Sequence, residues 1–132
     1  GRLYGTNGKT GSLACIEMAT GKLLWRTEEI SEGAIVAADG MLYIYEGPKK
    51  GVVSLVKAKP EGYERTGVFT VTEGTDNHWA HPTIANKRIY IRHGAAAGCF
   101  LPWSHRNRAT RIVALPTFLI GRLFSRGLLG QR

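Results

Sequence analysis

The chain has only two cysteines in 132 residues, Cys15 and Cys99, and they stand far apart. It lacks a Cys-x-x-Cys pair and any cluster of cysteine with histidine, which disfavours a structural zinc site. One disulfide is a hypothesis, but for Cys15 we prefer a small buried apolar side chain. No stretch near Gly1 is typical of a signal peptide, and no run of about 18 residues is apolar enough to cross a membrane.

Acidic residues are missing from the end of the chain. The net charge is +8, yet residues 1–100 carry all 10 acids together with 12 Lys and Arg, whereas residues 101–132 carry six arginines and no acid. The basic character therefore belongs to the tail. A basic tail can attract phosphate or anionic lipid, but the body lacks a basic stripe with interleaved aromatics. We expect no nucleic-acid partner, and membrane contact only through the tail.

A recurring phrase is the most informative feature that the chain does contain. Segments 38–44 and 85–91 align as Ala-Asp-Gly-Met-Leu-Tyr-Ile and Ala-Asn-Lys-Arg-Ile-Tyr-Ile. With the shorter copy at the start of the chain, the tyrosines of the phrase are Tyr4, Tyr43 and Tyr90. A period of about 40 to 50 residues with strand-like units is typical of propeller blades. Because such units cannot bury their faces alone, the sequence predicts a piece of a larger ring.

Short alternating segments between turn signals predict strands throughout the body. Thr20-Gly21 and Asp39-Gly40 suit the tight turns of hairpins, in which glycine supplies a positive φ. We expect strands over 2–6, 12–18, 23–27, 34–38, 41–45, 52–57, 63–72, 79–85 and 87–92. The predicted fold is all-β, a fragment of a β-propeller with about two four-stranded antiparallel blades and a partial third.

Beyond residue 93 the sequence changes character. We divide the chain into 1–93, the blades, and 94–132, a basic tail that is irregular or short-helical. Apolar residues at roughly helical spacing favour a short amphipathic helix there: Leu115, Phe118, Leu119, Leu123 and Phe124. A reading-frame shift near Gly94 would explain the sudden loss of acids. A genuine basic or disordered tail and an unrelated fused segment are the alternatives.

Residues 15–25 carry a motif, Cys-Ile-Glu-Met-Ala-Thr-Gly-Lys-Leu-Leu-Trp. It resembles the repeat of the pyrroloquinoline-quinone (PQQ)-type β-propeller superfamily, which includes quinoprotein alcohol dehydrogenases and BamB-like envelope proteins. Glu17 stands at the acidic position, and Thr20, Gly21 and Trp25 match the pattern. The resemblance covers residues 1–93 and implies that Glu17 bonds the turn of its own hairpin and that Trp25 docks onto the neighbouring blade.

The second blade departs from this motif, because it lacks both Thr-Gly and the tryptophan. Tyr63 or Phe69 is the substitute that we expect between the second and third blades. As an isolated piece with open sheet edges, the chain is expected to be poorly soluble or oligomeric.

The resemblance implies a bacterial protein of the periplasm or cell envelope, with neighbouring blades or another protein as partner. Quinone binding in the dehydrogenases uses adjacent cysteines and a calcium-binding set of acids and amides, and neither pattern occurs in this sequence. We therefore expect a non-catalytic binding or scaffold module with no cofactor of its own. The alternative is the C-terminal fragment of a PQQ-dependent alcohol dehydrogenase-like oxidoreductase, whose further blades would hold PQQ and calcium.

Three histidines are the candidate ligand or catalytic residues, His78, His81 and His93. His78 and His81 would share a face only on a helix, and their segment is typical of a loop that leads into a strand, so local backbone bonding is a better explanation than a metal site. Trp79 is expected to pack. One acidic cluster could perform acid–base chemistry, but we interpret it as a solvated loop between blades: Glu28, Glu29 and Glu32.

Overall fold

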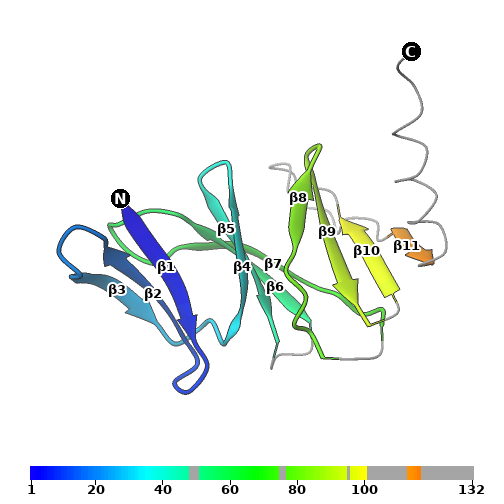
Figure 1. Ribbon diagram of the computed structural model, residues 1–132, viewed down its shortest axis with the longest axis horizontal. Helices are drawn as coiled ribbons and strands as arrows, with labels where there is room; N and C mark the ends of the chain where they lie inside the picture. Colours follow the sequence, from blue (N-terminus) through cyan, green and yellow to red (C-terminus); the bar gives the residue numbers. More distant parts are fainter. Residues whose placement is uncertain (48–50, 75–76, 95, 101–112, 117–132) are drawn as a thin grey trace, which may run out of the picture.

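The computed structural model describes residues 1–47, 51–74, 77–94, 96–100 and 113–116. Within these ranges the chain contains strands and connecting loops and no helix, so no helix that could span a membrane is found there. The strands form three antiparallel sheets that follow one another along the long axis of the molecule (Figure 1). The all-β prediction is confirmed for the part of the chain that is described.

Each sheet is a meander in which strands that follow one another in sequence are hydrogen-bonded neighbours. The first sheet contains β1 (Arg2–Asn7), β2 (Ser12–Glu17) and β3 (Leu23–Thr27). The middle sheet contains β4 (Gly33–Ala38), β5 (Met41–Glu46), β6 (Val52–Lys57) and β7 (Arg65–Thr70). The third sheet contains β8 (Thr83–Ala85), β9 (Arg88–His93), β10 (Ala96–Phe100) and β11 (Val113–Pro116).

The nine strands expected up to residue 92 are all present. The bounds of β3 and β6 match the predicted 23–27 and 52–57. The largest difference is at β8, which begins at Thr83 and not at residue 79. Pro82 stands directly before it, and a proline has no N–H to contribute to a ladder of hydrogen bonds.

The expectation that the strand pattern ends near Gly94 is wrong. β10 pairs with β9 from Ala96↔His93 to Phe100↔Ile89, and β11 pairs with β10 in turn. The two alanines and the glycine of β10 have low intrinsic strand preference, so this strand depends on pairing with the edge of β9. Leu115 of the expected helix lies in β11, and the other residues of that helix lie outside the described ranges.

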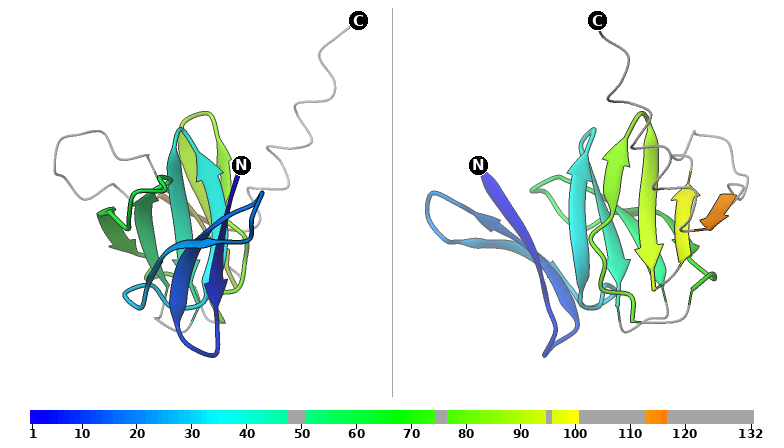
Figure 2. Two further views of the ribbon diagram at one scale, coloured as in Figure 1. Left: turned by 90° about the vertical axis from the view of Figure 1, so that its left-hand side faces the viewer. Right: turned by 45° about the vertical axis from the view of Figure 1, so that its right-hand side comes forward.

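The middle sheet is apolar on both faces, because side chains alternate along a strand. Leu42 and Ile44 of β5 are in a buried cluster with Leu13 and Ile30, which belong to the first sheet and to the connection that follows it. Tyr45 points the other way, into a second cluster that includes Ile89 and Ile91 of the third sheet. The middle sheet is therefore covered on both faces. Figure 2 shows the three sheets from two further directions.

The first and middle sheets repeat the same register. Tyr4 faces Cys15 across the first sheet, and Tyr43 faces Leu55 across the middle sheet. The register of the next strand pair in each sheet shifts directly after these residues. The shift lies between Cys15 and Ile16 in the β2–β3 pair and between Leu55 and Val56 in the β6–β7 pair. A bulge at the same place in two sheets is a structural repeat that the recurring phrase alone did not show.

Two hairpin turns of the repeat have positive φ at both central residues. The values are 50° and 73° at Asp39 and Gly40, and 50° and 56° at Asn86 and Lys87. This conformation favours glycine at the second position, and the copy with Lys87 carries a strain that the copy with Gly40 avoids.

The substitution Lys87→Gly is therefore expected to raise the free energy of unfolding by about 0.5–1 kcal/mol, because it removes a left-handed non-glycine residue. Gly40→Ala is the matched control and should lower the free energy of unfolding by a similar amount. Urea unfolding followed by circular dichroism measures both. A lower unfolding midpoint for Lys87→Gly would contradict the argument.

Candidate functional site

Trp25 joins the first sheet to the middle sheet. Its indole Nε1–H donates a hydrogen bond of 2.8 Å to the carbonyl oxygen of Lys59, 34 residues further along the chain. Its ring lies between Tyr4 and Tyr63, with ring centroids 6.0 and 6.2 Å away. A large aromatic side chain with a polar edge suits such a junction, because it buries area while its N–H is satisfied.

The other three motif residues shape the hairpin that leads to Trp25. Thr20 donates from Oγ1 to Oε2 of Glu17 at 2.5 Å, and the backbone N–H of Gly21 donates to the carbonyl oxygen of Glu17 at 2.9 Å. Gly21 has a φ of 71°, which favours glycine. These bonds set the turn from which β3 starts, and hence the place at which Trp25 meets the middle sheet.

The junction between the middle and third sheets is built differently. At the place where Cys15 faces Trp25 in the first sheet, Leu55 faces Gly67 in the middle sheet. Phe69 packs against the cluster that contains Ile89 and Ile91 of the third sheet, whereas Tyr63 lies with the cluster on the first-sheet side. Of the two expected substitutes for the missing tryptophan, Phe69 is the one on the correct side.

Glu46 is a buried carboxylate at the end of β5, with 1% of its surface exposed. Its Oε2 accepts hydrogen bonds from the N–H and Oγ of Ser31 at 2.9 and 2.8 Å. Its Oε1 accepts from Oγ of Ser54 at 2.6 Å. The carboxylate thereby ties the connection between β3 and β4 to β5 and β6, which is a structural use of a buried charge.

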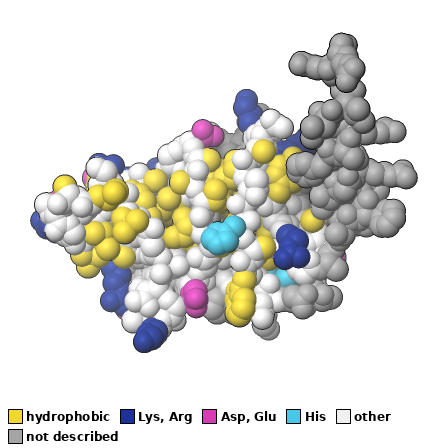
Figure 3. Space-filling view, in the orientation of Figure 1, with side chains coloured by type: hydrophobic (Ala, Val, Ile, Leu, Met, Phe, Trp, Pro, Cys, Tyr) yellow, Lys and Arg dark blue, Asp and Glu magenta, His cyan; other side chains and the backbone are white. Residues whose placement is uncertain are grey.

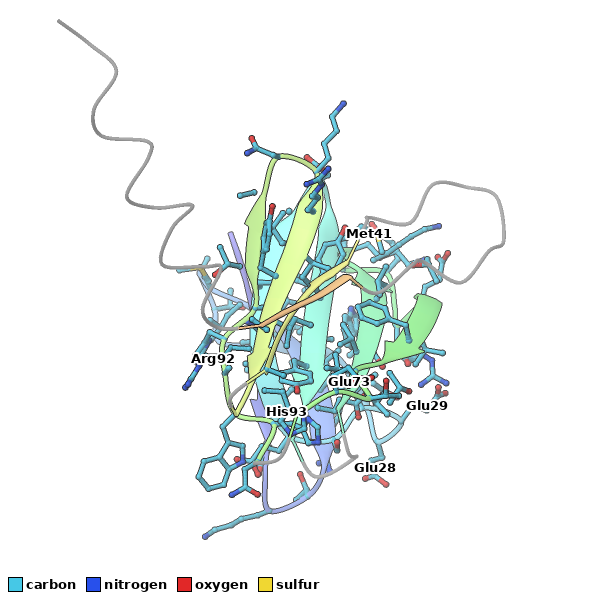
Figure 4. The ribbon with its side chains drawn as sticks, turned by 90° about the vertical axis from the view of Figure 1, so that its right-hand side faces the viewer. Glu28, Glu29, Met41, Glu73, Arg92 and His93 are labelled. Atoms are coloured by element: carbon cyan, nitrogen blue, oxygen red, sulfur yellow. The ribbon has the colours of Figure 1, made fainter. Side chains whose placement is uncertain are left out.

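Two histidines meet at the end of the middle and third sheets. The rings of His78 and His93 lie with centroids 3.8 Å apart and planes tilted by 31°. Nδ1 of His78 is 2.5 Å from the hydroxyl of Tyr45, and Nδ1 of His93 is 2.7 Å from the carbonyl oxygen of Glu73. Figure 4 shows His93 beside Glu73, while Arg92 of the same strand points away. We call His78, His93 and Tyr45 the histidine stack.

Burial shifts the pKa values of His78 and Tyr45. Burial, followed by the nearby His93, lowers the pKa of His78 below its usual value. Burial also raises the pKa of Tyr45 to about 12, so its hydroxyl keeps its proton near neutral pH. The two imidazole rings are stacked with their planes tilted by 31°.

The remaining sequence candidates lie outside the histidine stack. His81 is exposed, and His78 stacks on His93 and does not share a face with His81, an arrangement that the sequence already disfavoured. The expectation that Trp79 packs is wrong, since 76% of its surface is exposed. Its loop runs past Gly47, and only one edge of the indole approaches that backbone.

The acidic cluster is exposed as expected, and two of its members are in ion pairs. Glu28 pairs with Arg26 at 3.1 Å, and Glu29 pairs with Arg65 at 3.5 Å and accepts a hydrogen bond from Tyr63. Pairs at this level of exposure contribute little to stability. Cys15 is a buried free thiol, in line with the preferred interpretation of the sequence. No group of three or more potential metal ligands occurs among the described residues.

Sequence reasoning did not single out Glu46 or Tyr45, and it did not bring His78 and His93 together. For Glu46 the sequence did contain a signal, because a glutamate at the end of a strongly apolar strand indicates a buried carboxyl group that needs hydrogen-bond partners. No spacing rule links His78 to His93, because they come from a loop and a strand that only the stacking of sheets brings into contact.

No protein-family model matches the chain, and no curated protein matches it either.

We expect Trp25→Ala to lower the free energy of unfolding by about 2–4 kcal/mol, because it removes the aromatic contact and the bond to Lys59. Trp25→Phe keeps most of the packing and should lose about 1 kcal/mol. Trp79→Ala is the control, since its largely exposed ring should change stability by less than about 0.5 kcal/mol. Equal effects of Trp25→Ala and Trp79→Ala in urea unfolding would refute the junction role.

Glu46→Ala leaves three donor groups without an acceptor and should lower the free energy of unfolding by about 3 kcal/mol. Glu46→Gln should cost less, about 1 kcal/mol, because its one carbonyl oxygen can still accept from Ser31 and its amide can donate to Ser54. Thermal unfolding of the two variants at pH 7 separates the contribution of the hydrogen bonds from that of the negative charge. A larger loss for the glutamine variant would show that the negative charge itself is required.

Proposed function

We propose that this chain is a non-catalytic scaffold segment of a propeller-type stack of sheets. In this proposal the outer face of the first sheet, the face turned away from the middle sheet, docks a further antiparallel sheet of the same repeat. The stack acts as a rigid frame, and the loops at the ends of the strands are available to a protein partner.

One repeat position carries the proposal. The residue before the recurring tyrosine is Leu3 in the first sheet, Leu42 in the middle sheet and Ile89 in the third. Leu42 and Ile89 are 2% and 3% exposed, because each lies under the preceding sheet. Leu3 is 56% exposed. The same position is thus buried by a preceding sheet in two copies and lacks that cover in the first copy.

The surroundings of Leu3 have the same apolar character. Leu3 faces Ile16 across the first sheet, and Ile16 faces Leu23, which is 53% exposed. Met18 extends this row and is 66% exposed. Figure 3 shows hydrophobic side chains gathered over the end of the molecule that holds the first sheet. Contiguous exposed apolar surface of this kind favours an interface.

The contacts of the motif in residues 15–25 support a propeller-type stack of sheets. Trp25 contacts the neighbouring sheet and Glu17 bonds the turn of its own hairpin, as expected for a PQQ-type repeat. A location in the bacterial cell envelope and a protein partner follow from that resemblance and remain part of the proposal. The oxidoreductase alternative stays a prediction, because no observation on the described residues favours it.

The proposal predicts that the full chain self-associates at pH 8, because a second copy covers the apolar row when no other sheet does. The double variant Leu3→Lys/Leu23→Lys should shift the chain toward the monomer by placing two charges on that face. Size-exclusion chromatography with light scattering at about 10–100 µM measures the mass, a range in which weak association is visible.

Val68→Lys is the matched control, since Val68 is similarly exposed, at 54%, but lies on β7 of the middle sheet. It should leave the mass unchanged. A monomeric wild type, or an equal effect of the control, would rule out the outer face of the first sheet as the docking face. Circular dichroism checks that each variant keeps its strands.

A further inference from the structure

The histidine stack is the polar part of an otherwise apolar junction. Tyr45 comes from β5 of the middle sheet, His93 ends β9 of the third sheet, and His78 lies in the loop between β7 and β8. His78 therefore contacts both sheets. Its Nδ1 lies 2.5 Å from the hydroxyl oxygen of Tyr45, and its ring stacks on the ring of His93. Tyr45 and His93 are both buried.

The hydrogen bonds specify where the protons lie. A carbonyl oxygen can only accept, so Nδ1 of His93 donates to Glu73. The buried hydroxyl of Tyr45 donates to Nδ1 of His78 when that nitrogen carries a lone pair. A proton on Nδ1 of His78 reverses this bond, and the hydroxyl hydrogen of Tyr45 then has to find another acceptor in the buried cluster.

Electrostatics act in the same direction. Among the described residues, the ionisable groups that contact His78 are His93 from β9 and Tyr45 from β5, while Glu73 contacts His93 through its backbone carbonyl. None of the described carboxylates forms an ion pair with His78. A positive charge on His78 is thus opposed by burial and by any charge on His93.

We propose that the histidine stack is a proton-operated latch between the middle and third sheets, closed while the ring of His78 is neutral and released when that ring binds a proton. The folded pKa of His78 is lowered relative to the unfolded value of about 6.5. The open state therefore binds the proton more readily than the closed state. The stabilisation by His78 is present above about pH 6.5 and is lost as the pH falls below that value.

The test is amide hydrogen exchange of the full chain at pH 7.5 and pH 5.5, corrected for the intrinsic exchange rate at each pH. The opening equilibrium of β8 and β9 is expected to rise several-fold at pH 5.5, while β1 and β2 of the first sheet change less. His78→Asn places an amide oxygen where Nδ1 lies, keeps an acceptor for Tyr45 and cannot take up a proton. Its β8 and β9 should lose most of this pH dependence.

His81→Asn is the matched control, because His81 is exposed and lies outside the histidine stack; it should keep the wild-type response. An unchanged pH response in His78→Asn overturns the latch. If that variant does not fold, an NMR titration of the wild-type histidines decides, and a pKa of His78 at or above about 6.5 also overturns it. The outcome is separate from self-association through the first sheet, which is measured at pH 8.

Discussion

The middle sheet must be covered on both faces, and the rest of the structure follows from this constraint. Alternation along β5 sends Leu42 and Ile44 toward the first sheet and Tyr45 toward the third. A sheet with two apolar faces is not stable alone in water, because burying area on one side leaves the other exposed. The three meanders therefore stabilise one another as a stack, and the position of each side chain in that stack decides what it can contact.

The two junctions of the stack use different chemistry. The first junction depends on Trp25, whose indole combines aromatic contacts with one hydrogen bond and has no titratable group. The second has Gly67 at the corresponding ladder position and relies on Phe69 and the histidine stack. Because this junction contains the titratable ring of His78, it can respond to protons below about pH 6.5, whereas an indole has no titratable group. The first and middle sheets thus have the same register, while the two junctions between sheets are built from different side chains.

Most of the fold was readable from local patterns. Turn pairs such as Asp39-Gly40 and the alternation around Tyr43 predicted the hairpins, because both depend on residues close in sequence. The prediction was weakest at β8, which is shortened beside Pro82, and at β10, whose two alanines and one glycine carry little strand signal. Of the candidate site, the turn set by Glu17 and Thr20 followed from the motif. The exposure of Trp79 did not, because burial depends on which loop passes over a residue.

Antiparallel hairpins with a repeat of about 40 to 50 residues follow from the sequence alone, since turn chemistry and side-chain alternation are local properties. By contrast, the contacts of His78 with His93 and Tyr45, and the burial of Glu46 among serine donors, depend on the stacking of the sheets. These contacts join residues from separate loops and strands, and their partners are fixed by how the sheets stack, a property that no local pattern contains.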